Sequence, residues 1–208
     1  MHRASWDRSH VSFPRQATLA YPFEQVVAAH FQKFPDPTRV REIKRVDVIG
    51  RVDIADPDAA ADGDAAPIQF IQRKFTVENT APRVIKAFGL PDPVYFLEDT
   101  ALDPNRRVMR TRGRNLSFGR LGECTEETVF ADAEGEGAGT SLTQYGACVC
   151  HRCGPLKAIV ERYANRFVRD GAQDGVQAFR DYLARTAEAV AAKQQQQQQQ
   201  QQQAKGDG

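Results

Sequence analysis

The chain has 208 residues, and its 28 Lys and Arg residues nearly balance its 27 Asp and Glu residues, so the formal net charge is only +1. This balance argues against recognition of nucleic acid or an anionic surface through a strong overall field. With 41% hydrophobic and 26% charged residues, the composition is that of an ordinary globular domain. No stretch reaches the roughly 18–20 uninterrupted apolar residues that a membrane-spanning helix needs.

Both ends of the chain are expected to lie outside the folded domain. Residues 1–12 are mostly polar and basic and lack the continuous apolar core of a secretory signal, so they are expected to be flexible, with a transit peptide as the alternative. At the other end, the ten consecutive glutamines Gln194–Gln203 offer no apolar face to bury. Residues 193–208 are therefore predicted to be a disordered polyglutamine tail, which leaves residues 13–192 to fold.

The first part of this domain predicts a strand, a helix and a hairpin. Alternation of apolar and polar residues over Phe13–Leu19 indicates a strand. Apolar residues recur every three or four positions over Phe23–Phe34, which predicts an amphipathic helix that the following prolines terminate. The partly alternating runs Val40–Ile54 and Ile68–Val77 are separated by a loop of Ala, Asp and Gly, and together they predict a β-hairpin.

An apolar, proline-rich segment follows the hairpin. The segment Asn79–Pro93 combines three prolines and a glycine with five apolar residues between Pro82 and Pro91, which suits a loop with one short helical turn. These apolar residues are Val84, Ile85, Ala87, Phe88 and Leu90. Apolar loop side chains require a covering surface. Packing against the edge of the sheet and contact with a bilayer are the two alternatives.

The rest of the chain predicts a strand meander and then a long helix. Turn signals separate four runs typical of strands: Val94–Ala101, Arg107–Leu116, Glu123–Ala131 and Thr140–Cys150. Beyond Gly154-Pro155 the apolar residues recur every three or four positions, which indicates a helix of about 30 residues. The order of elements predicts an α+β domain in which a curved sheet wraps a terminal helix.

The four cysteines do not predict a metal site. Cys148, Cys150 and Cys153 stand close to His151, and thiolates and imidazole are zinc ligands. In a strand, however, His151 points away from the face that Cys148 and Cys150 share, and there is no second cysteine pair. Thiols at the end of the last strand, reduced or oxidised, are the simpler interpretation. The chain also lacks a Gly-x-Ser-x-Gly elbow and an evident Cys–His partnership, so it is not expected to be an enzyme.

An ordered series of segments resembles the PRELI family of lipid-transfer proteins. Phe31–Pro37 looks like the end of that family's amphipathic helix with its proline turn, and Phe96–Asp103 is similar to its glutamate-x-serine strand and turn. Four further segments resemble family strands in the same order: Arg45–Arg51, Gln72-Arg73, Arg110–Ser117 and Thr125–Phe130. The resemblance spans about Phe13 to Leu183.

The resemblance implies a seven-stranded curved antiparallel sheet that grips a long C-terminal helix around a lipid cavity, a START-like helix grip. It implies a carrier that shuttles an anionic phospholipid such as phosphatidic acid between mitochondrial membranes, in the intermembrane space, without covalent chemistry and without a cofactor. The implied partners are the phospholipid ligand, a transient membrane surface and a small helical-hairpin protein with twin cysteine motifs, but not nucleic acid. Exposure of acyl chains to water costs roughly 0.8 kcal/mol per methylene, so a phospholipid crosses water only if a carrier buries its chains.

The matched positions suggest site residues. Cations near a buried phosphate are required, and the candidates for headgroup binding are Lys33, Arg41 and Arg73. Each could instead be a solvated surface cation. The residues that resemble the family's mobile loop over the cavity, a lid, are Val84, Ile85, Phe88 and Leu90.

The long helix departs from the family pattern. Where family members commonly have an asparagine followed by a lysine-glycine pair, this chain has Gly171 and, three residues on, Asp174-Gly175. A carboxylate at Asp174 would repel a phosphate. The alternative is therefore a partner-bound scaffold of the same fold that has lost lipid carriage.

Overall fold

The computed structural model describes residues 13–36, 38, 40–56, 65–87, 89–135 and 139–206. The elements in chain order are β1 (Phe13–Leu19), α1 (Phe23–Gln32), β2 (Ile43–Ile54), β3 (Ile68–Val77), α2 (Arg83–Lys86), β4 (Val94–Asp103), β5 (Val108–Asn115), β6 (Gly122–Asp132), β7 (Thr140–Cys150), the 3₁₀ turn η2 (Gly154–Leu156) and α3 (Lys157–Gly206). The segment expected to be flexible, residues 1–12, lies outside the described residues.

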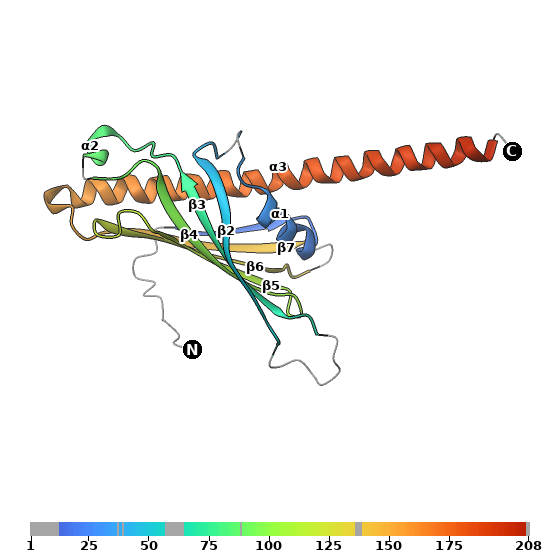
Figure 1. Cartoon of the computed structure of the whole chain (residues 1–208), viewed down its shortest axis with the longest axis horizontal. Coiled ribbons are helices and arrows are strands. Elements are labelled where there is room, and N and C mark those ends of the chain that lie inside the picture. The colour runs from blue at the N-terminus through green and yellow to red at the C-terminus, as the bar shows by residue number, and fades with distance from the viewer. Residues whose placement is uncertain are drawn as a thin grey trace.

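The strands form one antiparallel sheet of seven strands in the order β1-β7-β6-β5-β4-β3-β2. The chain runs as a meander from β2 to β7, and β1 is added beside β7, so β1 and β2 are the two edges. Figure 1 shows the curved sheet with α3 running across it along the longest dimension of the molecule. The predicted fold class, a curved sheet gripping a long C-terminal helix, is confirmed.

The solid part of the interior lies where α1 and the middle of α3 meet the sheet. Alternating strand positions and one stripe of each helix supply its side chains, as the two periodicities require. The cluster consists of Leu19, Phe23, Val26, Ala29, Leu102, Met109, Phe130, Leu142, Val176, Phe179 and Leu183. A second, smaller cluster of buried side chains lies on β3 and β4 and consists of Phe75, Val77 and Val94.

Side chains of α3 attach the start of the helix to the sheet. Strand β1 pairs with β7 only as far as Gly146, so the backbone of Cys148 and Cys150 extends beyond it. The Asn165 amide accepts a hydrogen bond from the Cys148 N–H at 2.8 Å and donates one to the Cys148 carbonyl at 3.0 Å. The Glu161 carboxylate accepts from the Cys150 N–H at 2.8 Å. Two α3 side chains thus satisfy backbone groups that a neighbouring strand would otherwise pair.

Helix α3 is longer than the sequence pattern predicts. It continues through the glutamines to Gly206, so the prediction of disorder from residue 193 is wrong over residues 193–206. Glutamine is a good helix former, and no Gly or Pro interrupts the chain between Val176 and Lys205. A helix that the packed part of the domain has already nucleated is extended at little cost. Figure 1 shows this end of α3 projecting beyond the sheet.

None of the helices that the structure describes is both long enough and apolar enough to cross a membrane.

Candidate functional site

Two neighbouring chambers lie between the sheet and the helices. The inner chamber, of about 420 Å³, lies between α1, α3 and the concave face of the sheet. The outer chamber, of about 110 Å³, lies at the start of α3, against the ends of β4, β6 and β7 and the segment around residues 78–90. The residues that line both are Phe96, Cys124, Tyr163, Phe167 and Val168. Because these residues line both chambers, the two chambers lie side by side.

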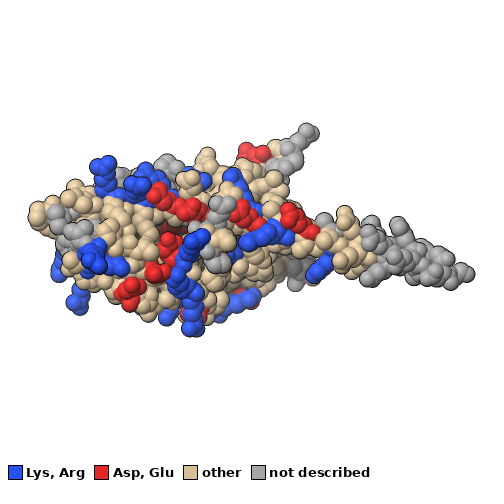
Figure 2. Space-filling view, turned by 90° about the horizontal axis from the view of Figure 1, so that it is seen from above, with Lys and Arg blue, Asp and Glu red and all other residues tan. Residues whose placement is uncertain are grey.

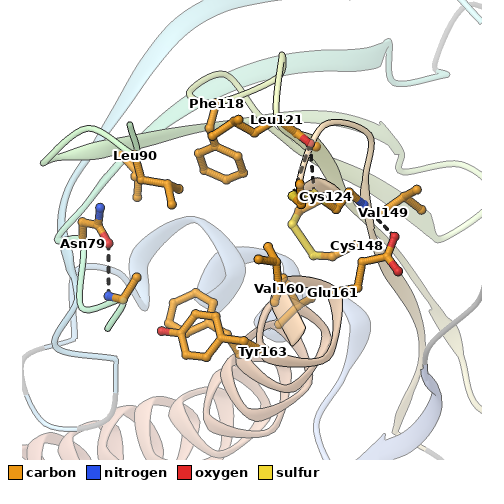
Figure 3. Close-up of a pocket in the computed structure, with 18 of the residues that line it drawn as sticks. Asn79, Leu90, Phe118, Leu121, Cys124, Cys148, Val149, Val160, Glu161 and Tyr163 are labelled. Carbon is orange, nitrogen blue, oxygen red and sulfur yellow. Dashed lines mark hydrogen bonds between the residues drawn. A yellow bond between two sulfur atoms is a disulfide. The ribbon is translucent and has the colours of Figure 1, made fainter. Parts of the chain in front are cut away.

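The outer chamber is apolar. Figure 3 shows Leu90, Phe118, Val160 and Tyr163 arranged around its interior, from the loop after α2, the turn after β5 and helix α3. Few polar atoms lie on these walls, and the nearby Glu161 carboxylate is engaged with the Cys150 N–H. Such a lining suits hydrocarbon and disfavours a charged group.

Disulfides form part of the outer wall. Cys124–Cys148 joins the neighbouring strands β6 and β7, and Cys150–Cys153 joins the end of β7 to the residue before η2. The thiols that a zinc site would need are therefore bonded to each other. Figure 3 shows the Cys124–Cys148 bond beside the apolar side chains of the chamber.

Lys33 brings a buried cation into the inner chamber. It follows the last residue of α1, where the helix dipole favours positive charge, and only 8% of its surface is exposed. Its Nζ lies 3.6 Å from the ring centroid of Phe179 and 4.6 Å from that of Phe34, and it finds no carboxylate or hydrogen-bond acceptor among the described residues. Burial lowers the pKa of Lys33 to about 7, although Glu98 and Glu126 act in the opposite direction. An anion beside Nζ would supply the missing counter-charge and favour the protonated form of Lys33.

A charged network supports Lys33 from the sheet side. The Arg73 guanidinium, 2% exposed, donates to Oε1 of Glu98 from Nε at 2.9 Å and from Nη2 at 2.6 Å, and its Nη1 donates to the His30 carbonyl at 3.2 Å. Burial alone would raise the pKa of Glu98, but His30 and Arg73 outweigh this and hold it well below its usual range. Burial lowers the pKa of His30 to about 4. The Arg73 and Glu98 charges therefore neutralise each other beside a neutral His30.

A second polar pair lies on the floor of the inner chamber. Glu126 on β6 and Gln144 on β7 both line it, and Nε2 of Gln144 donates to Oε1 of Glu126 at 2.8 Å. Gln144 is 7% exposed, and its Oε1 has no hydrogen-bond partner among the described residues. Burial raises the pKa of Glu126, and the neighbouring Glu98 adds to this effect. The pair offers hydrogen-bond acceptors to whatever fills the chamber.

The roof and the side opening of the inner chamber come from α3. Gly171 and Gly175 line it, and a Cβ added at either would meet no atom within 4 Å, so glycine leaves room there. At the opening the lining includes Glu42, Asp170 and Asp174. Figure 2 shows acidic side chains beside a hollow in this face, with acidic and basic side chains intermingled around it.

The structure places the three predicted headgroup residues differently. Lys33 lines the inner chamber. Arg73 lies behind the wall, where Glu98 neutralises it. Arg41 is exposed and is not part of the lining, although its neighbours Val40 and Glu42 are. Binding by Arg41 and Arg73 stays a prediction.

The predicted lid is only partly described. Leu90 lines the outer chamber, as a lid residue should. Val84 and Ile85 belong to α2, but their side chains lie outside the description, and Phe88 lies outside the described residues altogether.

Four polar residues of the site were not singled out from the sequence: His30, Glu98, Glu126 and Gln144. A signal existed for Glu126, because it shares the strand phase of the buried Phe130, and a charged residue in that phase must face the interior. The phase of Gln144 follows in the same way from the buried Leu142. The Arg73–Glu98 pairing depends on strand register, which the sequence did not specify.

Comparison of the sequence with known families identifies the family of this chain. The model of the PRELI-like family matches residues 24–189, which is most of the chain. The chain belongs to the PRELI-like family. It is 29% identical over 115 residues to the "PRELI domain-containing protein 1, mitochondrial" of Gallus gallus, covering 54% of this chain and 48% of that protein. For the Bos taurus protein of the same name the identity is 26% over 121 residues, covering 57% and 50%. The chain thus spans about half the length of the curated relatives it matches.

Solved structures support the fold alone. The Zhui aromatase/cyclase from a Streptomyces species superposes with a TM-score of 0.54 at 12% identity, covering 84% of this chain and 94% of that one. The di-domain aromatase/cyclase StfQ of the steffimycin pathway gives a TM-score of 0.52 at 12% identity, covering 86% and 52%. Both place the chain among helix-grip folds.

Proposed function

We propose that this PRELI-like chain carries a phospholipid between mitochondrial membranes, with the phosphate at Lys33 and the acyl chains running along the apolar walls of the outer chamber. The observation that carries the proposal is the buried ammonium of Lys33, which has no carboxylate partner among the described residues and lines a chamber that borders an apolar one. A phosphate would supply the missing counter-charge, and hydrocarbon would cover the apolar wall. An amphiphile with both parts satisfies both chambers at once.

The finer features of the proposal come from the family. The names of the curated relatives support a mitochondrial location, and we extend this to the intermembrane space. Phosphatidic acid is the first ligand to test, because its headgroup is a phosphate alone and a single cation such as Lys33 can bind it. Carriage requires no covalent step, and release requires contact with a membrane surface. A helical-hairpin protein with twin cysteine motifs is the proposed partner.

A vesicle assay tests the proposal. Donor vesicles contain phosphatidic acid, and its arrival in acceptor vesicles is measured with wild type, Lys33→Met and Lys44→Met, with and without a hairpin partner. Lys44 is the matched control, because its exposed ammonium pairs with Glu78 at the surface. We expect transfer by wild type and Lys44→Met and a loss of about tenfold or more in Lys33→Met, the size of a lost charge-assisted contact. Equal transfer by Lys33→Met would overturn the proposal, and so would the absence of transfer by wild type of both phosphatidic acid and any other phospholipid placed in the donor vesicles.

A further inference from the structure

The charges that line the inner chamber do not suit a purely anionic headgroup. The basic residues of the lining are Lys33 and Arg166, whereas the acidic ones are Glu42, Glu98, Glu126, Asp170 and Asp174. Glu98 is neutralised by Arg73, and Nε of Arg166 lies 3.4 Å from Oδ2 of Asp170. The remaining charged groups of the lining are one cation, Lys33, and three carboxyl groups, of which Glu126 acts on Lys33 directly. A phosphate alone would use the cation and leave the acidic side without a counter-charge.

The floor of the chamber adds unused acceptors. The Oε1 atom of Gln144 is buried without a hydrogen-bond partner among the described residues, and the carboxyl group of Glu126 is fixed beside it by the Gln144 amide. Buried polar atoms of this kind normally have a partner. Gly113, opposite Glu126 on β5, also lines the chamber and keeps the space beside this pair open. A ligand group that donates hydrogen bonds would satisfy both acceptors.

We infer that the headgroup is zwitterionic, with an aminoethyl phosphate whose phosphate binds Lys33 and whose primary ammonium binds Glu126 and Gln144. The inference rests on the proposed function and narrows its headgroup. A quaternary ammonium has no N–H to donate to Gln144, and a headgroup with an added carboxylate would bring negative charge toward Glu126 and the acidic opening. Ethanolamine phospholipid is therefore favoured over its choline and serine counterparts.

The same features explain how such a ligand would stabilise the site. Lys33 and Glu126 each carry a charge that burial disfavours. A zwitterion supplies an opposite charge to each without adding net charge to the interior, whereas a dianion compensates only one. Asp174, which departs from the family pattern, then lies on the route of an ammonium instead of obstructing a phosphate.

The test compares three lipids with matched acyl chains in one vesicle assay: phosphatidylethanolamine, its N-acetylated form and phosphatidic acid. Acetylation removes the ammonium and leaves the phosphodiester. We expect wild type to transfer phosphatidylethanolamine at least about fivefold faster than its N-acetylated form, and Glu126→Gln to bring these two rates close to equality. Gln144→Met should shift the ratio in the same direction, and Glu127→Gln, in the opposite strand phase, is the control.

The outcomes separate the inference from the proposed function. If no lipid is transferred, the proposed function fails. If phosphatidic acid is transferred but acetylation makes no difference in wild type, the inference fails and carriage stands. Equal slowing of all three lipids in Glu126→Gln would make Glu126 a structural residue and would also overturn the inference.

Discussion

Replacing Lys33 by methionine should stabilise the lipid-free protein while abolishing its carriage. Lysine and methionine have similar length, and methionine fills an apolar site without a charge. In the folded protein the ammonium has two aromatic rings as neighbours and no carboxylate partner among the described residues. The substitution removes the cost of burying that charge and keeps most of the packing.

The magnitude follows from the titration of Lys33. A pKa of about 7 in place of 10.5 corresponds to a cost of about 5 kcal/mol for the charged form. This figure is an upper bound, because the folded protein can release the proton near neutral pH. The mutant also loses a cation–π contact worth about 1–2 kcal/mol. We therefore expect a net stabilisation of about 1–3 kcal/mol at neutral pH, which for a domain of this size raises the midpoint of thermal unfolding by roughly 2–12 °C.

The pH dependence of unfolding independently checks whether the charged form of Lys33 destabilises the folded protein. Between the folded pKa of about 7 and the unfolded value of 10.5, the unfolded state binds more protons at Lys33 than the folded state does. The free energy of unfolding of wild type should therefore gain a rising component as pH increases from 7 to 10, and Lys33→Met should lack it. Glu98, Arg73 and Glu126 act on the same ammonium, but both carboxyl groups stay ionised in the unfolded state across this range.

Urea denaturation of delipidated wild type, Lys33→Met and the surface control Lys44→Met measures both effects. A lower free energy of unfolding in Lys33→Met, or the same pH slope in all three proteins, would refute the reasoning that the ammonium is buried and unpaired.

Three further predictions concern the surrounding structure. Glu98→Gln leaves the buried Arg73 charge unpaired, so it should cost about 3–5 kcal/mol, a fall of roughly 6–20 °C in the unfolding midpoint by calorimetry; a change below 1 °C would show that Arg73 does not depend on Glu98. Gly171→Ala and Gly175→Ala should each stabilise α3 by about 1 kcal/mol in urea denaturation, since the added Cβ meets no atom; destabilisation would mean that the roof lies closer to the sheet. Deleting residues 194–208 should change the free energy of unfolding by less than about 0.5 kcal/mol and lower the helical circular dichroism signal, and an unchanged signal would contradict a helical tail.

The spacing of apolar residues and the position of turn residues predict most of the fold. The strand alternation of Phe13–Leu19, Ile68–Val77 and Thr140–Cys150 agrees with β1, β3 and β7 to the residue, because each strand has one buried face and clear turn residues at its ends. The tail was misjudged for a physical reason. Low hydrophobicity predicts that a segment has nothing to pack against, but it does not predict loss of helix when a packed helix leads directly into it.

The site was less predictable than the fold. Lys33 was identified because it follows the end of an amphipathic helix at a matched position. The sequence does not reveal that strand register places Arg73 opposite Glu98. Charge partners between strands depend on register, and register emerges from the whole sheet.

Photo-crosslinking with a phospholipid that carries a diazirine at the end of one acyl chain tests the central claim most directly. If the phosphate lies at Lys33 and the chains occupy the outer chamber, mass spectrometry should find adducts on chamber residues such as Phe118, Val160 and Tyr163, and Lys33→Met should remove them. Adducts confined to exposed residues of β2, such as Val48 and Val52, and unaffected by Lys33→Met would contradict the account.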